Sequence, residues 1–167
     1  AGGAYGRIVP MTEPKWLTPV EREAWLALVS VTTLLPAALD SELQVQAKIT
    51  LFDYTVLAML SEAPDHILPM SELASRTSSS LSRLSHVVKK LEGRGWVMRS
   101  RSAEDARVTI AKLTGEGWDT VVSLAPEHVD SVQKLIFQGL DDRDVAELAR
   151  IGRKLVGRLN PEHWILR

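Results

Sequence analysis

The segment SSSLSRLSHVVKKLEGRGW, residues Ser78–Trp96, decides the fold because it combines an apolar stripe with a polar face of short side chains. Its apolar residues recur at spacings of three and four, which predicts an amphipathic helix with one buried side; they are Leu81, Leu84, Val87, Val88 and Leu91. The other faces carry serine beside arginine, histidine and lysine, although serine favours helix less than glutamate or lysine does. Short hydroxyls among cations suit a surface that approaches a negative, hydrogen-bonding partner such as duplex DNA.

The composition is that of an ordinary globular protein with a core of its own. Of the 167 residues, 45% are hydrophobic and 25% are charged. The chain contains no Cys, which excludes disulfides, thiolate metal sites and cysteine-based redox sensing. We expect a cytoplasmic protein with no membrane partner, because we find neither a secretion leader nor an apolar run near the ~20 residues of a membrane-spanning helix.

The charge of the chain is distributed unevenly. Between Arg76 and Arg107 there are eight basic and three acidic residues, which gives this segment a net charge of +5. The whole chain carries −1, so the remainder carries −6. A basic segment on an acidic protein is the electrostatic pattern expected of a nucleic-acid-binding surface.

The order of the predicted elements is four helices, a hairpin and two helices. Residues 1–17 are expected to form a disordered or non-native N-terminus that includes the start of a long helix. The helical pattern is clear from Thr18 onward, and Pro36 should kink or end this helix. Thr50 and Asp53 form a capping-box pattern that starts the second helix. The stretches WVMRSR and VTIAKLT flank a charged turn and predict a two-stranded hairpin. The fold class is mainly α with a small β-hairpin wing, a winged helix-turn-helix.

In this geometry the second helix of the pair enters the major groove, and its N-terminal half meets the base edges. The residues so placed are Ser80, Ser82, Arg83, Ser85 and His86. Arg83 can read guanine with two hydrogen bonds. The alternative interpretation is a solvated helix face with ordinary capping serines.

The predicted hairpin carries a second group of candidates at its tip, namely Arg101, Asp105 and Arg107. An arginine there can enter the narrow minor groove, and Asp105 can orient the guanidinium of Arg107 through a salt bridge. Alternatively, the two residues form an exposed surface pair that contributes little.

The stretch from Met70 to Gly117 resembles the MarR family of bacterial transcriptional regulators. The resemblance rests on S-x-S-R-x-S at Ser80–Ser85, V-x-x-L-E-x-x-G-W at Val88–Trp96, and D-x-R…LT-x-x-G at Asp105–Gly117. It extends more weakly from Thr18 to the terminal helices.

The resemblance implies a homodimeric repressor that binds a pseudo-palindromic operator and is often released by a small aromatic ligand. Its recognition helices would lie roughly 34–36 Å apart. Residues 18–49 would form an N-terminal dimerisation helix, 50–114 the DNA-binding domain and 115–167 the C-terminal dimerisation helices. The terminal Trp164, Ile165 and Leu166 would need a partner to cover them. Phosphate contacts would fall to Arg76, Lys89 and Arg99.

Other sites have weaker signals. The aromatic residues Trp16, Trp25, Phe52, Tyr54 and Trp118 either line a ligand pocket or belong to the core. The four histidines show no metal-ligand spacing, although His128 beside acidic residues is a faint metal candidate, and we predict neither a metal nor a cofactor. No nucleophile–base pattern points to catalysis, so we predict no enzyme. The rival function is a winged-helix scaffold for protein interactions without specific DNA binding.

Overall fold

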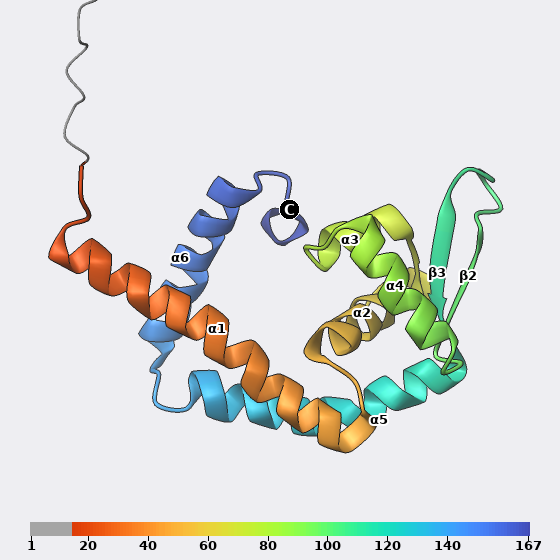
Figure 1. Ribbon diagram of the computed structural model, residues 1–167, viewed down its shortest axis with the longest axis horizontal. Helices are drawn as coiled ribbons and strands as arrows, with labels where there is room; N and C mark the ends of the chain where they lie inside the picture. The colour runs from red at the N-terminus through yellow and green to blue at the C-terminus, as the bar shows by residue number, and fades with distance from the viewer. Residues whose placement is uncertain (1–14) are drawn as a thin grey trace, which may run out of the picture. The chain divides into compact units, whose positions relative to one another are not determined.

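The structure is a computed structural model that describes residues 15–167. The predictions made for residues 1–14 lie outside this range. The chain forms two compact units that divide between Leu34 and Leu35. The second unit contains all of the elements that follow the first helix (Figure 1).

The first helix, α1 (Pro19–Ala47), crosses the division between the units and continues through Pro36. Among the described residues, it is the one helix long and apolar enough to cross a membrane by length and composition, with a mean hydropathy of 1.4 over 18 residues. The expectation that no segment reaches this length was therefore wrong. Uncharged residues run from Trp25 to Leu39, and the threonines and alanines among them interrupt the apolar pattern without adding charge. A helix of this composition is suited to packing against another helix as well as to crossing a membrane.

Three helices form the body of the second unit: α2 (Leu51–Ser61), α3 (Met70–Arg76) and α4 (Leu81–Glu92). The capping box predicted at the start of α2 is confirmed, because Thr50 accepts the backbone N–H of Asp53 and Asp53 accepts that of Thr50. A 3₁₀ turn, η1 (Pro64–His66), joins α2 to the first strand. The third of the four helices predicted before the hairpin is confirmed as α3.

The sheet has three antiparallel strands, because a third strand joins the predicted hairpin, which is confirmed. The strands β2 (Val97–Arg101) and β3 (Thr109–Leu113) form the expected hairpin, with Arg101 opposite Thr109. The additional strand β1 (Ile67–Pro69) pairs with the free edge of β3 and places Leu68 in the core. Three residues are too few to show the alternation by which a strand is recognised, so only pairing with β3 identifies this segment.

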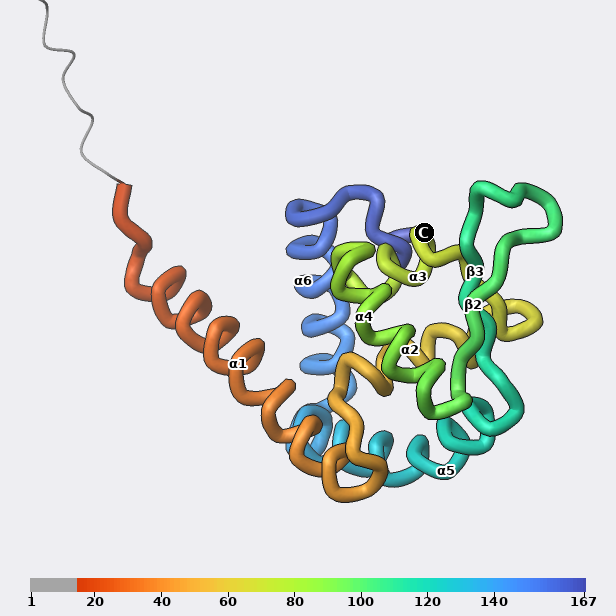
Figure 2. The backbone as a smooth tube through the Cα atoms, turned by 45° about the vertical axis from the view of Figure 1, so that its right-hand side comes forward, coloured from red at the N-terminus to blue at the C-terminus, as the bar shows by residue number. Residues whose placement is uncertain are grey.

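The core lies among α2, α3, α4 and the sheet (Figure 2). From the predicted stripe, Leu84, Val88 and Leu91 are fully buried and Val87 packs against the core. Leu81 is different, because 56% of it is exposed. Leu81 is the first residue of α4, and helical side chains lean towards the N-terminus of their helix, which turns this one away from the core.

The chain ends in α5 (Gly115–Val132), a π-helical turn η2 (Gln133–Phe137), α6 (Asp142–Leu159) and a 3₁₀ turn η3 (Trp164–Leu166). Asp141 caps α6 with a complete capping box, as its sequence predicts. In both views the C-terminal segment lies beside α3 (Figures 1 and 2).

Candidate nucleic-acid interface

The N-terminal half of α4 presents a polar surface to solvent. Ser80 is the N-cap and its hydroxyl accepts the backbone N–H of Arg83 at 3.2 Å. Ser82, Arg83 and His86 are exposed and Ser85 is half-buried. The structure therefore brings the five predicted groove-reading residues together on one helix end. The exposed Leu81 lies among them, although its spacing matches the buried stripe and predicts a place in the core.

Arg83 is held by an aromatic ring that comes from another helix. Its guanidinium carbon lies 4.0 Å from the ring centre of Phe52, a half-buried residue in the first turn of α2. A cation over an aromatic face is attracted by the electron-rich ring, and the flat guanidinium stacks on it. The sequence left Phe52 either in a ligand pocket or in the core, and no sequence signal connected it with Arg83, which lies 31 positions away.

Two further basic residues near α4 are bound to the α1–α2 region. Lys90 donates to the carboxylate of Asp53 at 2.5 Å, and Asp53 is 1% exposed. Arg94 donates to the backbone carbonyls of Ala47 and Lys48 at 2.7 and 2.9 Å. The Lys90 contact holds the C-terminal half of α4 against the start of α2, and the Arg94 contacts hold the turn after α4 against the end of α1. Both cations therefore have a structural role in the unbound protein.

The three predicted phosphate contacts differ in their surroundings. Arg76 pairs with Glu72 at 3.0 Å. Arg99 donates to Glu92 at 2.6 Å and to Ser85 at 3.2 Å. Hydrogen bonding to Arg99 holds the pKa of Glu92 below its usual value, which keeps this carboxylate ionised. Lys89 is exposed on α4 and extends from the same helix as Arg83.

The wing residues lie where the sequence predicts, at the tip of the β2–β3 hairpin. Arg107 contacts both carboxylate oxygens of Asp105 at 3.1 Å, and its side chain is 91% exposed. The side-chain hydrogen bond from Arg107 lowers the pKa of Asp105. Arg101 donates to the hydroxyl of Thr109 at 3.2 Å across the hairpin. The predicted orienting pair is thus formed in the unbound protein.

The predicted aromatic pocket residues lie in different surroundings. Tyr54 belongs to the core and stacks with His128 at 4.3 Å between ring centres. Trp118 stacks with His66 at 4.7 Å, whereas Phe52 holds Arg83. Trp16 and Trp25 belong to the first unit and are exposed. Burial lowers the pKa of His128. Residues 15–167 contain no group of three His, Asp or Glu arranged to hold a metal ion.

Comparison with known proteins identifies the family to which this arrangement belongs. The MarR family profile matches residues 49–109, which span α2 to the start of β3. The curated repressor MprA of Escherichia coli is 28% identical over 107 residues, and the match covers 64% of this chain but only 60% of that repressor.

Solved structures match over nearly the whole chain. A MarR family regulator from Streptomyces coelicolor, solved in complex with DNA, is 38% identical, with a TM-score of 0.86 and coverage of 90% of this chain and 94% of that one. AbsC, a second MarR family regulator from the same organism, is 34% identical with a TM-score of 0.84, and the match covers 89% of this chain and all of AbsC. The chain therefore belongs to the MarR family of transcriptional regulators, as the motifs between Met70 and Gly117 predict.

Proposed function

We propose that this protein is a sequence-specific repressor that binds a pseudo-palindromic operator in the bacterial cytoplasm as a homodimer. The observation that carries the proposal is the exposed N-terminal half of α4 beside a wing whose Arg107 is oriented by Asp105. Short polar side chains on α4 let the helix approach the base edges closely, and Leu81 adds an apolar contact suited to a thymine methyl group.

Only some of the basic residues on α4 and the hairpin support the proposal, because others are already bound within the protein. Lys90, Arg94 and Arg99 are engaged within the protein, so they position α4 and the hairpin. Arg83, Lys89 and Arg107 extend from the two elements that a winged helix places in the grooves. We therefore assign base reading to Arg83, minor-groove contact to Arg107, and phosphate contact to Lys89 first.

The proposed homodimer is supported by an apolar stripe on α6. Leu148, Ile151, Leu155 and Leu159 recur at helical spacing and are between 42% and 86% exposed. A stripe of this kind is stable in water only when another apolar surface covers it. A second copy of the chain would supply such a surface and would place two recognition helices on two half-sites.

The surroundings of the recognition helix support the proposal of a small aromatic effector. Cavities of about 510 and 350 Å³ lie there, and both are lined by Phe52 and Arg83. An aromatic anion in either cavity would compete with Phe52 for the Arg83 guanidinium. This competition would change the conformation of the side chain assigned to base reading.

Arg83→Ala is expected to abolish most of the discrimination between operator and random DNA, a loss of about 1–3 kcal/mol, because a bidentate arginine–guanine contact supplies energy of that size. Fluorescence anisotropy would compare the DNA that precedes this protein's own coding sequence with a random duplex of equal length, at several salt concentrations. The same titration, at duplex concentrations far above Kd, gives the number of chains bound per duplex, which should be two.

The wild-type protein should bind the upstream fragment far more tightly than the random duplex. Equal, weak binding to both would favour the interaction scaffold. If the wild type discriminates and Arg83→Ala keeps the same specificity ratio, α4 only positions the protein and Arg83 reads no base.

Arg107→Ala is expected to weaken binding of the upstream fragment by about fivefold or more, because an arginine in a narrow minor groove gains from its enhanced negative potential. Folding stability should not change, since the side chain is 91% exposed. Arg143→Ala on α6 is the matched control for loss of one positive charge. Equal affinities of both variants at matched salt would exclude the wing from the mechanism.

A further inference from the structure

The turn between α3 and α4 has an unfavourable backbone conformation at one residue. Ser78 has a φ of 50°, in the left-handed region that glycine adopts easily and other residues rarely do. Such a conformation persists only where surrounding contacts stabilise it. Because α4 begins three residues later, the conformation of Ser78 sets the position from which the recognition helix starts.

Some of these contacts come from the turn itself. The backbone N–H of Ser78 donates to the carbonyl of Ser75 at 3.1 Å, and that of Ser79 donates to Ala74 at 3.0 Å. The hydroxyl of Thr77 lies 3.0 Å from that of Ser79. These bonds close the end of α3, but none of them involves the side chain of Ser78 or the carbonyl of Arg76.

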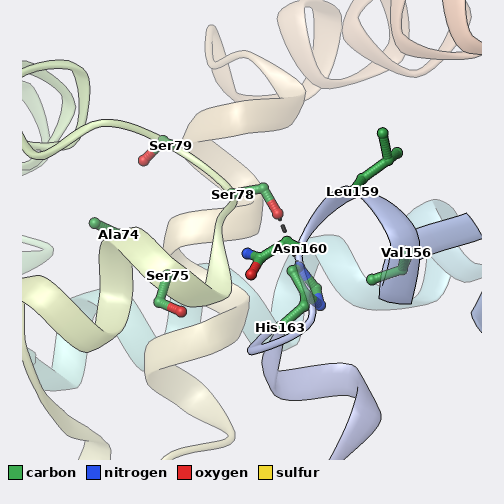
Figure 3. Close-up of a pocket in the computed structure, with 8 residues that line it drawn as sticks. All are labelled: Ala74, Ser75, Ser78, Ser79, Val156, Leu159, Asn160 and His163. Atoms are coloured by element: carbon green, nitrogen blue, oxygen red, sulfur yellow. Dashed lines mark hydrogen bonds between the residues drawn. The ribbon is translucent and has the colours of Figure 1, made fainter.

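The C-terminal segment supplies both missing contacts. The ring Nε2 of His163 lies 2.9 Å from the hydroxyl of Ser78, 85 positions away (Figure 3). The indole N–H of Trp164 donates to the carbonyl of Arg76 at 3.0 Å, across 88 positions. That carbonyl belongs to the last turn of α3, where the final carbonyls have no partner inside the helix. Trp164 thus caps α3 from outside.

The segment that provides these contacts is itself bound to α6. Arg153 on α6 donates to the carbonyl of Ile165 at 2.5 Å and to that of Leu166 at 3.4 Å. The backbone N–H of Leu166 donates to the backbone carbonyl of His163 at 3.0 Å, which closes the 3₁₀ turn η3. The contacts to the α3–α4 turn are therefore connected to α6 through a fixed turn.

Little side-chain packing reinforces this connection. A cavity of about 390 Å³ lies between α6 and the α3–α4 turn, and Figure 3 shows that both sides contribute its lining; these residues are Ala74, Ser75, Ser78, Ser79, Val156, Leu159, Asn160 and His163. The two hydrogen bonds join the sides of this cavity, beside the half-buried ring of Trp164.

We propose that His163 and Trp164 are positioning residues for DNA recognition. They hold the α3–α4 turn in its left-handed conformation and thereby fix where the N-terminal half of α4 lies. The effect on DNA binding rests on the proposed function, whereas the effect on the turn does not. The sequence predicts that Trp164 needs a partner to cover it; in this structure its indole N–H is bonded within the chain.

Two full-length variants test the proposal with little risk to folding. Trp164→Phe keeps an aromatic ring and removes the indole N–H, and Ser78→Ala removes the hydroxyl that contacts His163. The matched controls are Glu162→Gln, an exposed residue of the same segment, and Ser123→Ala, an exposed serine on α5. Amide hydrogen exchange, read by mass spectrometry on peptides, reports the turn separately from the other elements.

Each test variant should raise exchange in peptides covering residues 76–84 by about fivefold, the effect of losing one hydrogen bond. Exchange in α2 and in the β2–β3 hairpin should stay unchanged, as should all exchange in the two controls. Affinity for the upstream DNA fragment should fall by about two- to fivefold in the same two variants.

Unchanged exchange at residues 76–84 in both variants would overturn the proposal, and so would an equal rise in α2 and the hairpin. A local rise in exchange without any loss of affinity, for a fragment that the wild type binds tightly, would show that the contact does not position α4. If the wild type fails to discriminate the upstream fragment, the proposed function fails, while the exchange data still decide whether the C-terminal segment holds the turn.

Discussion

Gly117→Ala is expected to destabilise the protein by about 3 kcal/mol or more, because α5 begins in direct contact with the backbone of the preceding elements. A Cβ atom at Gly117 would lie 2.1 Å from the carbonyl oxygen of Trp96 and 2.7 Å from a methyl group of Leu113. The same carbonyl accepts the N–H of Thr114 at 3.0 Å, so it cannot move away without breaking the base of the hairpin. Urea unfolding followed by circular dichroism measures the effect.

Gly115→Ala is the matched control for this substitution. It changes the same residue type two positions earlier, and nothing lies within 4 Å of the added Cβ. Because alanine restricts the unfolded chain more than glycine does, this variant should be as stable as the wild type or slightly more stable. Equal stability of both variants would mean that the start of α5 is not packed against Trp96.

Asp53→Ala is expected to lower the free energy of unfolding by about 2–4 kcal/mol. The change removes the carboxylate that accepts the N–H of Thr50 at 2.8 Å and that binds Lys90 at 2.5 Å. Asp53 is 1% exposed, and its loss leaves the half-buried backbone N–H of Thr50 without its acceptor and frees one end of α4. A drop in Tm of several degrees should be visible by differential scanning calorimetry.

Asp53→Asn divides this effect into two parts. An asparagine keeps an oxygen that can accept the Thr50 N–H but loses the charge that binds Lys90, so its cost should be smaller than that of alanine. Asp119→Ala, an exposed acidic residue on α5, should cost less than about 0.5 kcal/mol. If Asp53→Ala costs no more than Asp119→Ala, the contact between α2 and α4 contributes nothing to stability.

The sequence alone determined the features that depend on neighbours in the chain. The capping boxes at Thr50 and Asp141 join residues three positions apart, and the stripe of Leu84, Val88 and Leu91 follows the helical repeat. The hairpin and its Asp105–Arg107 pair are local in the same sense. Such patterns appear directly in the order of residues, which is why the fold class and the family could both be predicted.

The tertiary structure decided which of the basic residues are engaged within the protein. The sequence could not separate Lys90 from Lys89, because the partner of Lys90 lies 37 positions away on α2. The Phe52 ring over Arg83, the third strand and the bond from Trp164 to Arg76 likewise join distant segments. These contacts exist only once helices and strands have packed, since their distances depend on how the elements are placed and not on spacing along the chain.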